Sequence, residues 1–252
     1  MNSLRTLAWV ETKLFLREPL ALIFAFAFPF FMLFVLLGVF GNESEVTDPE
    51  EAAIWRNVGP ADYYVSTYVG LVMSAAGVIT LPLRLAGYRE AGVLRRYRAA
   101  GVPLVVVLGS QVAVAMGMAM VAGACIVVVS TTLYDSVLPE NWPLVLGGIA
   151  IGLATFACIG IFLGAVLPTA RAVQGAGLAL FFVMMMVSGS GPPDGALTSQ
   201  MRSFAATLPL THVNHLVQDA WLGHGWSLGH ALVALAFAAL TALLALRWFR
   251  WE

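Results

Sequence analysis

Lysine, and charge in general, are scarce in this sequence. Lys13 is the single lysine among 252 residues, and no glycine-rich loop precedes it. A P-loop needs a lysine to reach the phosphates of a nucleotide, so this chain does not supply a P-loop ATPase. Charged residues make up only 11% of the sequence, and its mean hydropathy is +0.87. A water-soluble domain carries roughly a quarter charged residues, and the composition therefore excludes one.

Cysteine is also rare, and histidine is absent from the apolar runs. Cys125 and Cys158 both fall inside such runs, where cysteine acts as a small apolar side chain, and they predict no disulfide framework. Residues 188–191 invite comparison with intramembrane serine proteases. A serine nucleophile needs a base that a third group positions, and no histidine falls within the predicted spans to serve as that base.

Long apolar runs dominate what remains. Six of them approach the roughly 20 residues that cross a hydrocarbon core: residues 20–40, 64–83, 104–130, 144–167, 172–187 and 231–249. We predict an all-α polytopic membrane protein with six transmembrane helices, forming one domain over residues 1–252. The first run is longer than the apolar part of a signal peptide and lacks a small-residue cleavage site, so we expect it to be retained.

Basic residues fall mostly on one side of these spans. Eleven of the thirteen Lys and Arg residues precede span one, join spans two and three or four and five, or follow span six, and five of them lie between Arg84 and Arg98. Only Arg56 and Arg202 fall on the other side, together with most of the acidic residues. Short loops rich in Lys and Arg stay in the cytoplasm, which predicts that both termini are cytoplasmic.

Two segments outside the spans carry their own patterns. Residues 1–18 have an apolar and a basic face and predict a helix lying in the membrane interface. Glu11 and Glu18 lie on its apolar face, and a basic partner is the only explanation that the sequence offers for them. Residues 189–230 begin with a glycine-rich stretch that carries Pro192 and Pro193, followed by a mixed stretch, 208–222, that is too polar to span. They predict an external, re-entrant segment with one or two short helices.

Two smaller patterns are interpreted structurally. His212, His215 and Asp219 would share one face of a helix, and such side chains can hold a transition metal. We predict no metal site, because histidines on a polar helix are more often solvated or hydrogen-bonded, and the sequence leaves open whether these three residues bind anything. Span four carries four glycines that predict close helix packing within the chain: Gly148, Gly152, Gly160 and Gly164.

Several features occur in a defined order along the six spans. They are Arg17-Glu18-Pro19, Phe28-Pro29, the segment Tyr88-Arg89-Glu90-x-Gly92-x-Leu94, and Leu208-Pro-Leu-Thr-His212. In this combination the chain resembles the membrane subunit of a type 2 ABC exporter, the ABC-2 permease family, whose members include drug and lipid efflux permeases. The resemblance covers nearly the whole chain.

The resemblance implies how such a chain obtains energy. The loop between spans two and three, here residues 84–101, would form a coupling helix that docks on a cytoplasmic ATPase through Arg89, Glu90, Arg95 and Arg96. Guanidinium groups suit this role because they bind carboxylates in a fixed orientation. The alternative is that these arginines only set the topology or bind anionic lipids. ATP and Mg²⁺ would be bound by the partner, and this chain would hold no cofactor.

The resemblance also implies an assembly and a location. Two permease subunits, identical or related, would form one transporter in a bacterial cytoplasmic membrane. Family members usually carry bulky apolar residues where this chain has Gly189-Ser190-Gly191-Pro192-Pro193, so we expect a looser or differently sealed external gate.

Spans two and five would line the central cavity by the same resemblance. The candidate substrate-contacting residues are Thr67, Tyr68, Met73, Phe181, Phe182 and Met185. The methionines and phenylalanines are explained about equally well as apolar side chains that face lipid or other helices. The predicted function is export of a hydrophobic or amphipathic compound. The alternative is an ion-gradient-driven transporter, which would place ionisable residues near the bilayer midplane; the spans are nearly free of them there. A purely structural scaffold would not need the basic segment.

Overall fold

The computed structural model describes residue 9 and residues 11–14, 16–41 and 48–248. Six helices in this part of the chain are long and apolar enough to cross a membrane, and it contains no strand. The prediction of a six-span, all-α membrane protein is therefore confirmed. The predicted interfacial helix falls largely outside the described residues, although its residues 11–14 are helical. Glu43 and Glu45, two of the acidic residues that follow span one, also lie outside them.

The first two spans each contain a π-helical turn. Span one comprises α2 (Pro19–Leu22), the π turn η1 (Ile23–Ala27) and α3 (Phe28–Phe40), and span two comprises α5 (Pro60–Ala75), the π turn η2 (Ala76–Thr80) and α6 (Leu81–Glu90). The other spans are α8 (Leu104–Leu133), α9 (Trp142–Val166), α10 (Ala170–Val187) and α13 (Leu228–Trp248). Short elements join them: α4 (Pro49–Trp55), α7 (Val93–Ala99), the 3₁₀ turn η3 (Asp194–Ala196), α11 (Ser199–Ala205) and α12 (Pro209–Trp221).

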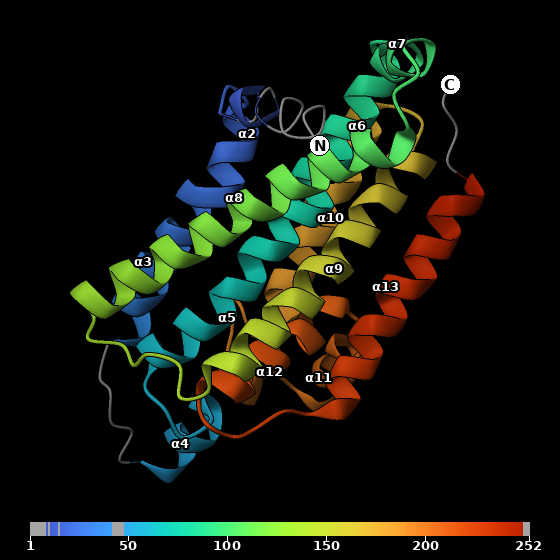
Figure 1. Ribbon diagram of the computed structural model, residues 1–252. Helices are drawn as coiled ribbons and strands as arrows, with labels where there is room; N and C mark the ends of the chain where they lie inside the picture. The colour runs from blue at the N-terminus through green and yellow to red at the C-terminus, as the bar shows by residue number, and fades with distance from the viewer. Residues whose placement is uncertain (1–8, 10, 15, 42–47, 249–252) are drawn as a thin grey trace.

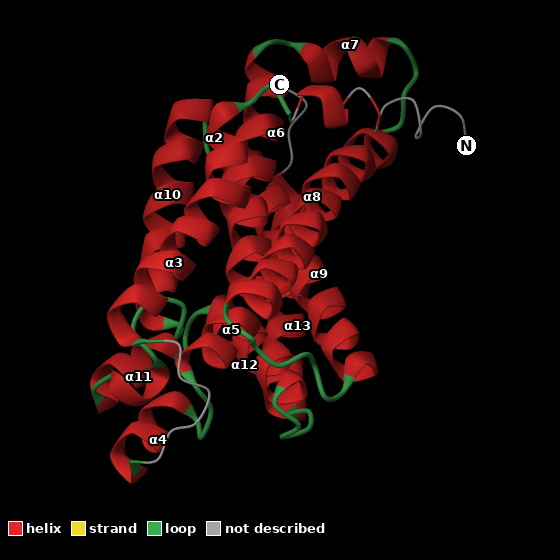
Figure 2. Cartoon of the chain, turned by 90° about the vertical axis from the view of Figure 1, so that its left-hand side faces the viewer, coloured by secondary structure: helices red, strands yellow, loops and turns green. Residues whose placement is uncertain are grey.

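The spans form a bundle with two distinct ends. Figures 1 and 2 show α7 at one end, here called the α7 end, and α4 and α11 at the opposite end, here called the α4 end. The final turn of α13 also lies at the α7 end (Figure 1). Span two is central, because 94% of its most apolar stretch is buried, against 22–44% for the other five spans. The membrane-facing sides of those five leave apolar side chains for lipid to cover.

Close backbone contacts hold α9 against the central span. A Cβ on Gly160 would lie 2.3 Å from the carbonyl oxygen of Gly77, and a Cβ on Gly77 would lie 2.4 Å from that of Phe156. Only glycine permits this approach, which is the role of small residues between membrane helices. Gly148 likewise meets the backbone of α12, whereas Gly152 and Gly164 meet side chains of other helices of the chain. The predicted role of the span-four glycines in intrachain packing is confirmed.

Helix α12 fills the α4 end of the bundle. It packs against α5, α9 and α13, and nearly all of its residues are buried. The predicted short helices of segment 189–230 are thus present as α11 and α12, and that the segment re-enters the membrane stays a prediction. Because α12 carries both apolar and polar side chains, it brings the polar ones into the interior, where they need partners.

Candidate functional site

The segment 84–101 divides into two parts at the α7 end. Its first part, up to Glu90, continues the second span as the last turns of α6. The chain then turns at Gly92, whose φ of +68° favours glycine, and α7 follows. The segment is therefore not one element: a membrane span ends in it, and a separate short helix lies across the end of the bundle (Figure 2).

Helix α7 is anchored by one side and exposed on the other. Leu94 is 1% exposed and packs with Leu85 and Val107. Arg95 and Arg96 are exposed. The two arginines therefore occupy a surface that a partner outside the membrane could reach, and their contact with an ATPase stays a prediction.

Arg89 and Glu90 contact other helices of the same chain. The guanidinium of Arg89 donates to the carbonyl oxygens of Gly164 and Ala165 at 3.1 and 3.0 Å, and also to that of Leu167, at the end of α9. Glu90 Oε1 accepts the backbone N–H of Ala170, the first residue of α10, at 2.8 Å. The sequence anticipated contacts of these two residues with a partner but not these contacts within the chain.

A buried ion pair lies beside them. Arg84 contacts Glu11 at 2.5 Å and Glu18 at 3.4 Å, and the side chains of Arg84 and Glu11 are each 1% exposed. Tyr88 donates to Glu11 at 2.9 Å. Burial raises the pKa of Glu11 although Arg84 and Tyr88 lower it, and burial likewise raises the pKa of Glu18. The basic partner expected for the two glutamates is thus Arg84, which joins the start of the chain to the second span.

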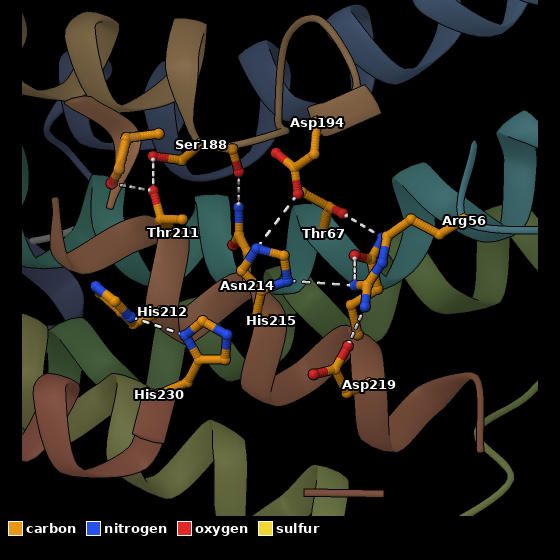
Figure 3. A network of polar contacts seen from close by, with 12 residues as sticks. Arg56, Thr67, Ser188, Asp194, Thr211, His212, Asn214, His215, Asp219 and His230 are labelled. Atoms are coloured by element: carbon orange, nitrogen blue, oxygen red, sulfur yellow. Dashed lines mark hydrogen bonds and ion pairs between the residues drawn. The ribbon is translucent and has the colours of Figure 1, made fainter. Parts of the chain in front are cut away.

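Arg56 organises a polar network at the α4 end (Figure 3). It follows α4 in a left-handed conformation with φ +59°, which is uncommon outside glycine, asparagine and aspartate. Its guanidinium donates to Gln218 and Asp219 of α12, both at 2.5 Å, and lies 3.3 Å from Nδ1 of His215. Gln218 in turn donates to the hydroxyl of Thr67 at 3.1 Å. The network therefore ties the segment before span two to α12 and α5.

Hydrogen-bond partners on both ring nitrogens orient two histidines of this network, His212 and His215. Because Arg56 can only donate, Nδ1 of His215 accepts and Nε2 carries the proton, which faces Asp194 at 3.4 Å. His212 donates from Nε2 to the carbonyl oxygen of Ala206 at 2.9 Å, so its Nδ1 accepts from His230 at 2.8 Å. Burial and the neighbouring Arg56 lower the pKa of His215 to about 4. Burial also raises the pKa of Asp194.

The lowered pKa of His215 predicts a pH dependence of stability. Its pKa is about 6.5 in an unfolded chain and about 4 here, so the folded state resists protonation. The group contributes stability above pH 6.5 and loses it as pH falls from about 6.5 to 4, by at most about 1.4 kcal/mol per pH unit. The midpoint of thermal unfolding, measured in nanodiscs at several pH values, should fall as the pH is lowered, and we call this fall the acid limb. The acid limb should be flatter for His215→Gln than for the unmodified chain.

Comparing the unmodified chain with His215→Gln separates the effect of His215 on stability from that of the charged and titratable groups around it. His215 faces Arg56, Asp194, Asp219, His212 and His230. Asp194 acts in the opposite direction, because a raised carboxyl pKa stabilises the folded state as pH falls. The exposed His224 is the matched control, since His224→Gln should keep the acid limb. Equal acid limbs for His215→Gln and the unmodified chain would contradict the prediction.

The segment after span five is tightly bound to α12 and α5, and of the two expectations for it, a looser or a differently sealed gate, these contacts favour the second. Ser188 accepts a hydrogen bond from Thr211 at 2.9 Å. Asn214 donates to the carbonyl oxygen of Ser188 at 2.7 Å and to the hydroxyl of Ser190 at 3.0 Å. Tyr64 donates to the carbonyl oxygen of Gly191 at 2.8 Å. Small residues at 188–191 let polar side chains of α12 and α5 reach the backbone, so hydrogen bonds seal the segment within the chain.

The six residues expected at a substrate cavity lie in different surroundings. Thr67 belongs to the Arg56 network, and Tyr68 and Met185 are buried. Phe181 and Phe182 form an aromatic cluster with Phe24 and Phe28 of span one. Phe182 is also 40% exposed. A single copy of the chain therefore does not place these six residues around one cavity.

Met73 alone among them lines an apolar pocket between α5, α8, α9 and α12. The pocket has a volume of about 380 Å³ and is partly open at the side of the bundle. Its lining includes Val69, Met120, Val127, Trp142, Val145 and Trp221. Met120 and Trp142 are also largely exposed, at 42% and 49%, so the opening faces where hydrocarbon would lie. Such a lining favours apolar ligands over charged ones.

Sequence patterns gave only weak signals for the residues that hold these sites together. Arg56 is one of two basic residues on the acidic side, which marks it as unusual, but nothing in the sequence pairs it with α12. His212 contacts His230, whereas His215 and Asp219 share Arg56 as a partner and His215 also faces Asp194. Among the described residues, no group of three or more His, Cys, Asp or Glu side chains could hold a metal ion.

The bundle of six apolar helices, with a helix laid across one end, defines a multi-pass membrane protein. The family model described as ABC-2 type transporter matches residues 2–222. The chain belongs to the ABC-2 type transporter family, whose members are transport subunits in the membrane and generally work with ATPase subunits. No curated protein matches the chain.

Proposed function

We propose that this chain is the permease subunit of an ATP-driven exporter. The observation that carries the proposal is α7, a short helix at one end of an ABC-2 bundle with Arg95 and Arg96 exposed on it. Two adjacent guanidinium groups suit the carboxylates of a docking groove, to which arginine binds in a fixed orientation. The α7 end is then cytoplasmic, in agreement with the excess of Lys and Arg there.

Energy comes from a separate subunit in this proposal. The single lysine, Lys13, excludes a P-loop in the chain, so ATP and Mg²⁺ are bound by the partner ATPase. Two permease subunits, identical or related, complete the pathway in a bacterial cytoplasmic membrane, with both termini in the cytoplasm.

The substrate we propose is a hydrophobic or amphipathic compound, such as a drug, a lipid-like molecule or a secondary metabolite. The apolar pocket that Met73 lines supports this class, as do the exposed Phe182 and Met186 of α10. Methionine adapts to apolar ligands of varied shape. Efflux from the cell follows from the exporter type that the sequence resembles.

Co-expression with an ATPase encoded beside this chain tests the proposal. We expect the ATPase to co-purify and to hydrolyse ATP, and the chain alone to release no phosphate above a detergent blank. Uptake of a hydrophobic dye into inverted vesicles should require ATP and persist when ion gradients are collapsed. Phosphate release by the chain alone, or uptake that needs an ion gradient and not ATP, would contradict the proposal, and the second result would favour the ion-gradient alternative.

A further inference from the structure

Arg89 and Glu90 bind the two ends of one short connection. Helix α9 ends at Val166 and α10 begins at Ala170. Arg89 donates to three carbonyl groups at the end of α9, while Glu90 accepts the first N–H of α10. Two neighbouring side chains of α6 therefore hold both sides of the α9–α10 connection, and we call this set of contacts the α6 clamp.

The charges of the clamp match the helix ends they meet. The last carbonyl groups of a helix have no partner within it and carry partial negative charge, whereas its first N–H groups carry partial positive charge. The cationic Arg89 is at the carboxyl end of α9 and the anionic Glu90 at the amino end of α10. An acidic side chain at position 89 or a basic one at position 90 would face a helix end of like charge. The charges of Arg89 and Glu90 therefore match the helix ends that they contact.

We propose that the α6 clamp transmits movement of α7 to α10, and that Arg89 and Glu90 are positioning residues within the permease rather than contacts to the ATPase. This inference rests on the proposed function. Only Ala91 and Gly92 separate α6 from α7, so a partner that moves α7 moves the end of α6. Because hydrogen bonds join that end to α9 and α10, the connection follows.

Helix α10 carries the movement to the opposite end of the bundle. It is a single helix from Ala170 to Val187. Directly after it, Ser188 is hydrogen-bonded to Thr211 and Asn214 of α12. A displacement at Ala170 therefore reaches the polar network at the α4 end through one rigid element and two hydrogen-bonded side chains.

The first arm of the test uses the permease alone. Amide hydrogen exchange of the peptide covering residues 164–172 should be roughly tenfold faster in Arg89→Ala and Glu90→Ala, because each loses a hydrogen bond to a charged group. The exposed Arg171 is the matched control, and Arg171→Ala should keep slow exchange. Unchanged exchange in both clamp variants would overturn the clamp as a structural constraint.

The second arm uses the complex with the ATPase in nanodiscs. A cysteine at the exposed Ala196, in a chain lacking Cys125 and Cys158, reports on the α4 end through its rate of reaction with a maleimide. We expect this rate to differ about fivefold or more between nucleotide-free and ATP–vanadate-trapped complexes. The difference should vanish in Arg89→Ala, although the ATPase still co-purifies, and remain in Arg171→Ala.

The outcomes separate this inference from the proposed function. Loss of ATPase co-purification in Arg89→Ala, with normal co-purification of Arg171→Ala, would overturn the inference and make Arg89 a docking residue. A reactivity difference that persists in Arg89→Ala, or that is absent from the unmodified complex, would overturn transmission through the clamp. An ATPase that never co-purifies with the unmodified chain contradicts the proposed function, whereas the exchange arm still tests the clamp.

Discussion

Replacing Arg84 with methionine is expected to lower the stability of the folded chain by about 3–5 kcal/mol. Arg84 pairs with Glu11 while both side chains are 1% exposed. Its removal leaves a buried carboxylate without a counter-charge, which costs far more than a lost surface ion pair. Thermal unfolding in nanodiscs can be measured as the fraction of protein that remains folded after heating. The midpoint of unfolding should be markedly lower for Arg84→Met than for the unmodified chain.

Two further variants distinguish the lost pair from the lost side chain. Arg17 is exposed at the same end, and Arg17→Met should leave the midpoint almost unchanged. The double variant Glu11→Gln with Arg84→Met removes both charges, so it should be more stable than Arg84→Met alone. If the double variant is no more stable than the single one, the charge pair is not the reason for the loss.

Reversing the charges of Arg95 and Arg96 together is expected to weaken binding of the ATPase by roughly 100-fold. Truncating one partner of a desolvated interfacial charge pair costs about 2–5 kcal/mol, and reversal adds repulsion to that loss. Both side chains are exposed on α7, while Leu94 anchors the helix from its buried side. The fold of the spans should therefore survive. Pull-down of the ATPase from detergent extracts measures the effect.

Arg171 again provides the control, because it is exposed at the same end of the bundle but lies on α10. Arg171→Glu should bind the ATPase normally. Should the Arg95→Glu and Arg96→Glu double variant bind as well as the unmodified chain, the arginines of α7 act as a topology signal or bind anionic lipids, and the docking assignment fails.

The spans could be predicted because membrane insertion depends on a local property. A run of about 20 apolar residues satisfies its backbone hydrogen bonds as a helix wherever the other spans lie. The glycines of span four were predictable to a similar extent, since small residues at helical spacing indicate close packing. The helix that these glycines meet could not be predicted, because the contact of Gly160 with Gly77 depends on how two distant helices cross.

Spacing could not identify the partners of residues that meet distant parts of the chain. His212, His215 and Asp219 share a helix, and the sequence could consider them only as one group. In the structure they pair with His230, Asp194 and Arg56, from three other parts of the chain. Arg89 and Glu90 likewise stood in a basic segment expected to face a partner, yet both reach helix ends about 75 to 80 positions away.

The sequence by itself determined that the bilayer is the main solvent of the chain and that the chain has six spans. It also determined the excess of basic residues on one side and the absence of a P-loop. Each of these properties depends on composition or on a short run of residues. The tertiary structure alone decided that Glu11 meets Arg84 73 positions away and that Thr67 meets Gln218 151 positions away. The physical reason is that a buried charge or amide must find a partner wherever packing brings one within hydrogen-bonding distance, and packing joins segments that the order of residues keeps apart.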